Sequence, residues 1–169
     1  MRETTEKLLV AVELLDRALR MYYEGSSYFA ALHLAGGAEE ILGVYVERRE
    51  GESSLKSLVS GAVEFSKLLN DGVASNPKNI RDAINHPKNQ TKHMDKGNGE
   101  YVTFDPKMEA RNLLERAVSN YYTLIRDNNR YNLPETGLLS RFNLEIIGLP
   151  SASVDRCSFS LRWIPARYS

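Results

Sequence analysis

Apolar side chains recur at steps of three and four positions along most of residues 5–126, and this spacing is typical of helices that bury one face. In the first such segment, residues 5–24, the recurring side chains are Leu8, Val12, Leu15, Leu19 and Tyr22. Gly25 follows this segment and offers a residue that commonly ends a helix. The pattern therefore predicts a first amphipathic helix over residues 5–24.

The same spacing predicts a second helix over residues 27–48 and a third over residues 55–69. The middle of the second contains two adjacent glycines, Gly36 and Gly37, among alanines. Each glycine costs a helix roughly 1 kcal/mol relative to alanine, and close approach of another backbone usually offsets such a cost. We therefore expect this segment to be either a central helix crossing or the seam of a dimer.

Two later helices begin at prolines. Asn76-Pro77 and Asp105-Pro106 each join a capping side chain to a proline in the first turn, which is typical of a helix start. We expect the helix from residue 77 to be short and to end or kink at Pro87, because proline disfavours helical geometry at the residue before it. The helix from residue 106 is strongly periodic as far as residue 125, and one short helical turn is expected near residues 138–142.

These segments predict an all-α fold, an up-and-down bundle of four to five helices with at least 50% helix and no sheet of three or more strands. We assign the bundle to residues 1–142 and a C-terminal tail to residues 143–169. In the tail, the alternation of Phe159, Leu161 and Trp163 is strand-like, and such a strand would pair weakly near residues 146–147. An irregular tail that lies over the bundle is the alternative.

The composition is that of an ordinary globular chain, with 42% apolar and 26% charged residues. Lys and Arg number 22 and Asp and Glu also number 22, so the net charge gives no general argument for nucleic-acid binding, although it leaves room for a local basic site. The single cysteine, Cys157, has no internal disulfide partner, which favours a reducing compartment. The first residues do not form a signal peptide, and no apolar run looks long enough to cross a membrane. We therefore expect a cytoplasmic protein without a membrane partner.

The chain contains three histidines, and one of them, His33, lies in the second predicted helix with Glu40 seven positions later on the same face. A metal site there would need further ligands, and the sequence contains neither HExxH nor clustered cysteines. We therefore expect a packed, hydrogen-bonded His33, no metal site and no cofactor.

The other two histidines lie in a polar segment that holds the candidate chemistry. Four residues separate Arg81 from His86, and four residues separate Lys88 from His93. Histidine can accept or donate a proton near neutral pH, and an arginine fork can bind a phosphate through two hydrogen bonds. Positions five apart on a continuous helix point about 140° from each other, so a break at Pro87 would free His86 to turn towards Arg81 or towards a second chain.

These segments resemble the motif of HEPN domains, helical bundles named for higher eukaryotes and prokaryotes nucleotide-binding proteins. In that motif Arg is followed by Asn, Asp or His and, a few residues later, by His. Residues 81–86, Arg-Asp-Ala-Ile-Asn-His, match it in full, and residues 88–93, Lys-Asn-Gln-Thr-Lys-His, match it with Lys in place of Arg. Residues 30–43 and 104–124 are also similar to uncharacterised bacterial HEPN-like proteins, in which the motif reads more like Arg-Asn-x-x-Lys-His and falls on residues 88–93. The resemblance covers about residues 5–142.

The resemblance implies a homodimeric, metal-independent endoribonuclease with the motif at the dimer interface. It implies phosphate binding by Arg81 and acid–base catalysis by His86 or His93. The residues expected to bind RNA or a nucleotide are Asn85, Lys88, Asn89 and Lys92. The alternative is a non-catalytic module that binds a nucleotide or a protein partner, for example in a toxin–antitoxin or defence complex. A further alternative is a polar segment whose cations and histidines only face solvent.

Overall fold

The structure, a computed structural model, describes residues 4–93, 100–126 and 131–148. Within these ranges the chain forms helices and no strand, and helices make up 75% of the described residues. The helices are α1 (Lys7–Glu24), α2 (Tyr28–Glu47), α3 (Ser54–Leu69), α4 (Pro77–Lys92), α5 (Pro106–Arg126) and α6 (Gly137–Ile146). The all-α prediction is confirmed, with six described helices where four to five were expected.

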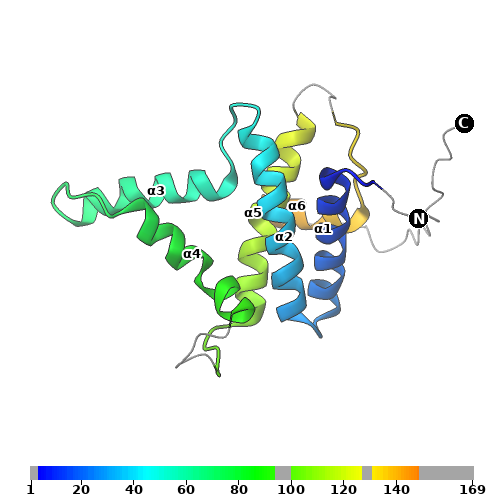
Figure 1. The fold of residues 1–169 in the computed structure, drawn as a ribbon, viewed down its shortest axis with the longest axis horizontal. Coiled ribbons are helices and arrows are strands. Elements are labelled where there is room, and N and C mark those ends of the chain that lie inside the picture. Colours follow the sequence, from blue (N-terminus) through cyan, green and yellow to red (C-terminus); the bar gives the residue numbers. More distant parts are fainter. Residues whose placement is uncertain (1–3, 94–99, 127–130, 149–169) are drawn as a thin grey trace, which may run out of the picture.

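Helices α1, α2 and α5 form the body of the molecule, and α6 packs against α1 and α5 (Figure 1). The core consists of apolar faces with the predicted spacing, and α2 lies between α1 and α5. The largest side chains with less than 2% exposure are Tyr121, Phe142, Leu15, Leu19, Leu32 and Leu42. We call α1, α2, α5 and α6 the bundle.

Helices α3 and α4 leave the bundle as a hairpin that we call the arm (Figure 1). The arm carries the chain from the end of α2 back to the start of α5, so α2 and α5 run in the same direction. The bundle is therefore not a simple up-and-down one, because a two-helix excursion replaces the short antiparallel connection that we expected. Both arm helices begin at capping side chains, because Ser53 and Asn76 accept hydrogen bonds from the backbone N–H groups of Lys56 and Lys78. The cap at Asn76 was predicted, whereas the cap at Ser53 was not.

We expected a helix that ends or kinks at Pro87, and α4 does not end there but continues through this proline to Lys92. Proline removes one backbone donor and disfavours a helix interior, but local propensity yields where tertiary contacts hold the chain. The residue after the proline, Lys88, is buried against α2 and fixes this part of the helix. The freedom that we expected for His86 is therefore absent.

The region near residue 142 also differs from the prediction. The expected single turn is a helix of three turns, α6, with Thr136 as its cap. It extends to Ile146, so the boundary that we placed after residue 142 falls inside a helix, and residues 146–147 are not available as a strand. Phe159, Leu161 and Trp163 lie outside the described residues.

Helix α2 also corrects our statement that no apolar run is long enough for a membrane. By length and composition α2 is long and apolar enough to cross one, and no other helix among the described residues is. The core helix of a soluble protein passes the same test, and half of the apolar window in α2 is buried inside the fold. Its central position between α1 and α5 accounts for its composition.

Candidate functional site

Helix α4 divides the candidate residues between two stripes, because neighbouring positions on a helix point about 100° apart. The first, which we call the cation stripe, has the spacing i, i+4, i+7, i+11 and consists of Arg81, Asn85, Lys88 and Lys92. The second, which we call the histidine stripe, is shifted by one residue and consists of Asp82, His86 and Asn89, with His93 directly after the helix end. The structure thus separates each cation from the histidine that follows it in the motif.

The centre of the cation stripe is buried where α4 crosses α2. Lys88 is only 5% exposed, and its ammonium lies 2.5 Å from Oε1 of Glu40. Its aliphatic stem occupies the space above Gly36, where an added Cβ would lie 2.6 Å from Cδ of Lys88. Gly36 is therefore the notch that lets α4 approach, and Lys88 is a structural contact between the arm and the bundle.

The two glycines of α2 both serve contacts within the chain. Gly36 receives the side chain of Lys88 from α4, and Gly37 faces the side chain of Leu14 from α1. The expectation of a central helix crossing is therefore confirmed for this segment. The argument that these glycines form a dimer seam no longer holds, because their space is already filled.

His33 lies on the same side of α2, one turn before the notch. Burial lowers its pKa below the ordinary value of 6.5, and the positive charges of Lys92 and Lys88 lower it further, while a hydrogen bond with the backbone of Thr91 opposes the shift. His33 is therefore neutral at physiological pH and packs against the end of α4. This agrees with the packed, hydrogen-bonded histidine that the sequence led us to expect.

A buried ion pair lies behind this crossing, between α2 and α5. The carboxylate of Glu39 and the guanidinium of Arg116 are both almost fully buried, with Oε1 and Nε 3.8 Å apart. Burial raises the pKa of Glu39 and lowers the pKa of Arg116, and the opposite charge of the partner limits both shifts. At this separation the pair is electrostatic and not a good hydrogen bond, so its desolvation is incompletely compensated.

Asn120 of α5 connects the bundle with the start of the arm. Its side-chain Oδ1 accepts a hydrogen bond from the backbone N–H of Ser54 at 2.8 Å, and its Nδ2 donates to the carbonyl of Glu39 at 3.4 Å. Its amide lies against Gly43, where an added Cβ would be 3.4 Å away. Asn120 is 1% exposed, and its hydrogen bond to Glu39 is buried, while the one from Ser54 is partly buried.

The sequence did not identify Glu39, Glu40, Arg116 or Asn120 as a group. The sequence does contain a signal, namely charged residues within an apolar segment. Two adjacent glutamates follow the glycines of an otherwise apolar helix. Arg116 and Asn120 likewise interrupt the apolar positions of residues 106–126 at a spacing of four. Buried polar groups need partners, so such interruptions indicate contacts between helices.

The remaining candidates on α4 lie at the surface. Arg81, His86, Asn89, Lys92 and His93 are all exposed, and Asn85 is half-buried. Because α4 is continuous, Arg81 and His86 point about 140° apart and cannot meet on one phosphate within a single chain. One chain can bind phosphates along α4, but it does not bring an acid–base histidine and a phosphate-binding arginine together.

Comparison of the chain with protein-family models, curated proteins and solved structures gives no match. The resemblance to HEPN domains therefore rests on the motif residues and helical segments of this sequence alone. Among the described residues, no group of three or more His, Cys, Asp or Glu side chains comes together in a way that could hold a metal ion.

Proposed function

We propose that the protein is a binding module whose exposed α4 surface holds the phosphate groups of RNA or of a nucleotide. The observation that carries this proposal is the charge distribution along α4. Lys78, Arg81 and Lys92 are exposed on this helix, and Asp82 is its only acidic residue, although the chain as a whole is neutral. Phosphate contacts dominate nucleic-acid affinity, so a local basic surface is sufficient for weak, sequence-independent binding.

The positions of these cations favour a chain of phosphates over a single phosphate. Arg81 and Lys92 are eleven residues apart on one helix, which separates them by about 16 Å along its axis. Two such cations contact different phosphates of one strand. Lys88 lies between them but is buried and paired with Glu40, so it makes no direct contact with phosphate and its charge is offset by that carboxylate.

Binding of a labelled mixed RNA pool, and of nucleotides, at several salt concentrations tests this proposal. We expect Arg81→Ala and Lys92→Ala each to weaken RNA binding and to reduce the slope of log affinity against log salt by about 1. Lys56→Ala is the matched control, because Lys56 is also an exposed lysine but lies on α3. Unchanged affinity in both α4 variants, or equal loss in the control, would contradict the proposal.

Metal-independent RNA cleavage by a homodimer is the second candidate function. It is favoured by the histidine stripe, where Asp82 lies one turn before His86 and Asn89 lies one turn after it on a fully exposed surface. A carboxylate at this spacing can orient an imidazole for proton transfer. The phosphate-binding arginine must then come from a second chain, since Arg81 of the same chain points elsewhere.

Cleavage of the same RNA pool with a chelator present separates the two functions. His86→Ala should abolish cleavage if residues 81–86 are the motif, and His93→Ala should abolish it if residues 88–93 are the motif. If the wild type binds RNA but does not cleave it, the result supports the binding module and contradicts the ribonuclease. The cytoplasmic setting, and a role in a toxin–antitoxin or defence complex with a protein partner, belong to this proposal.

A further inference from the structure

A stripe of apolar side chains on α3 has no partner within the described parts of the chain. Its members have the spacing i, i+4, i+7, i+11 and are Leu58, Ala62, Phe65 and Leu69. Phe65 is 61% exposed and Leu69 is 68% exposed, and the adjacent Leu68 is 81% exposed. Large apolar side chains that gather on one helix face at this exposure mark an interaction surface.

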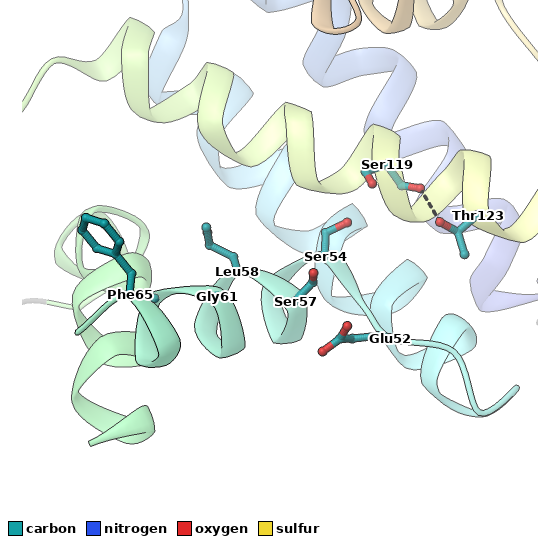
Figure 2. A pocket seen from close by; sticks show the side chains of 9 residues that line it. Glu52, Ser54, Ser57, Leu58, Gly61, Phe65, Ser119 and Thr123 are labelled. Atoms are coloured by element: carbon teal, nitrogen blue, oxygen red, sulfur yellow. Dashed lines mark hydrogen bonds between the residues drawn. The ribbon is translucent and has the colours of Figure 1, made fainter. Parts of the chain in front are cut away.

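This stripe borders a groove between α3 and α5, shown in Figure 2. Leu58, Ala62 and Phe65 line it from α3, and Ser119 and Thr123 line it from α5. Thr123 donates its hydroxyl hydrogen bond to the carbonyl of Ser119, so the hydroxyl is satisfied within its own helix. The α5 wall is therefore short-chained and uncharged, and it can accept a helix that lies along α3.

Gly61 provides room at the middle of the stripe. An added Cβ at this position would meet no heavy atom within 4 Å, whereas the glycines Gly36, Gly37 and Gly43 each face a neighbouring side chain. A helix-interior glycine lowers helix stability, and here no contact of the described chain uses the space that it leaves. The position is suited to close approach by a helix from outside the chain.

We infer that this face of α3 pairs antiparallel with α3 of a second copy of the chain. In a two-fold arrangement centred between residues 63 and 64, Leu58 lies opposite the second copy's Leu69, and Ala62 lies opposite its Phe65. Each large ring therefore meets a small residue, which is the large-to-small alternation that close packing requires. The two stripes have the same length because they are the same segment, as a two-fold interface demands.

Charge also favours a second copy as the occupant. On α3 the charged residues Lys56, Glu64 and Lys67 lie on the side opposite the stripe, and Lys67 and Glu64 form an ion pair with each other there. The stripe itself is thus uncharged, and Glu52, which precedes α3, is the one charged residue among the described residues that line the groove. The zero net charge of the chain gives no long-range repulsion between copies. Helix α3 runs outwards from the bundle as part of the arm (Figure 1).

The inference does not depend on RNA binding, although it would supply the second chain that cleavage requires. The mass of the full chain at tens of micromolar, measured by light scattering, tests it first. We expect twice the chain mass of 19.1 kDa for the wild type and a monomer for Phe65→Glu. Lys56→Glu, a charge change on the opposite side of α3, is the matched control and should remain a dimer. A monomeric wild type, or a dimeric Phe65→Glu variant with an unchanged thermal melt, would overturn the inference.

Thiol crosslinking then tests the antiparallel register, in a background that carries Cys157→Ser. Residue 62 lies about 4–5 Å along the axis from its own copy in this register, whereas residue 69 lies about 16 Å from its own copy. A short bifunctional thiol reagent should therefore link Ala62→Cys chains to each other, but not Leu69→Cys chains. A mixture of Leu58→Cys and Leu69→Cys chains should give the mixed dimer. Efficient linkage within the Leu69→Cys variant alone would overturn the register.

RNA binding by the monomeric Phe65→Glu variant distinguishes this inference from the proposed function. If that variant binds RNA as the wild type does, the α4 surface acts without pairing. If the wild type is a dimer that binds no RNA, the pairing stands and the proposed function fails.

Discussion

The bundle and the arm use apolar residues in different ways. In the bundle, the apolar faces of α1, α2 and α5 meet one another, and their central leucines are fully buried. In the arm, Val59 of α3 is the one buried apolar side chain, and α4 has none. The arm is instead attached through polar contacts, chiefly those of Lys88 and Asn120. The bundle is therefore stabilised by packing, whereas the arm keeps its position through a few specific contacts and leaves an apolar face exposed.

The largest difference between the two regions should appear on truncation of leucine. Leu32 on α2 is fully buried, and Leu68 on α3 is 81% exposed. We expect Leu32→Ala to lower the free energy of unfolding by about 2–5 kcal/mol, because it removes buried methyl groups and leaves a cavity. Leu68→Ala should change it by less than about 0.5 kcal/mol. Chemical denaturation of both variants measures this contrast, and similar losses would mean that the arm is packed in solution as tightly as the bundle.

A second contrast compares two helix-interior glycines. Gly36→Ala places a methyl group against the buried stem of Lys88, so we expect a loss of about 1–3 kcal/mol and weaker docking of the arm. Gly61→Ala is the matched control, with both substitutions made in the monomeric Phe65→Glu background so that no second copy occupies the space at Gly61. It enters open space there and should instead stabilise α3 by about 0.5–1 kcal/mol. Hydrogen exchange adds a local readout, because Gly36→Ala should reduce amide protection in α4 more than in α1. If both substitutions stabilise the protein, the notch at Gly36 is not a required contact.

Removing the contact through Asn120 should lower the free energy of unfolding by a similar or smaller amount than Gly36→Ala. Asn120→Ala leaves the N–H of Ser54 without its acceptor at the start of α3, and we expect a loss of about 1–3 kcal/mol. Asn112→Ala is the control, because Asn112 lies on the same helix but is exposed. Thermal melting measures the loss, and hydrogen exchange shows whether it is concentrated at the start of α3. An effect no larger than that of the control would show that Asn120 does not hold the arm.

The smallest expected effect is a pH dependence at the α2–α4 crossing. The pKa of His33 is lower in the folded state than its ordinary value of 6.5. Below about pH 6.5 the unfolded chain therefore binds a proton at His33 more readily than the folded chain does. The stability that His33 contributes is present above that value and is lost as the pH falls. We expect the wild type to lose stability from about pH 7.5 to about pH 5.5 more steeply than His33→Gln.

The buried carboxylate behind this crossing, that of Glu39, acts in the opposite direction. Burial raises the pKa of Glu39 above its ordinary value of 4.5, so its contribution improves as the pH falls towards that raised pKa. This is why the test compares the wild type with His33→Gln and does not use the wild-type profile alone. Parallel profiles for the two proteins would mean that burial and the charges of Lys92 and Lys88 do not oppose protonation of His33.

The sequence predicted the helices well, because helix formation depends on local features. Apolar spacing located α1, α2, α3 and α5, and the Asn76-Pro77 and Asp105-Pro106 signals located two starts. It failed at Pro87, where the local preference against helix was overcome by a contact between Lys88 and Glu40, 48 positions away. The sequence also predicted too short a helix for α6, which packs against α1 and α5 and buries Leu139 and Phe142.

The same distinction between local features and long-range contacts applies to the candidate site. The sequence by itself determined that α4 carries the cations and histidines, and that α2 contains a notch of small residues. Only the tertiary structure decided that Lys88 fills this notch and that α4 continues through Pro87, which leaves Arg81 and His86 on different faces of one helix. The physical reason is that spacing along a chain fixes which residues share a helix face, whereas the packing of distant segments decides which face is covered.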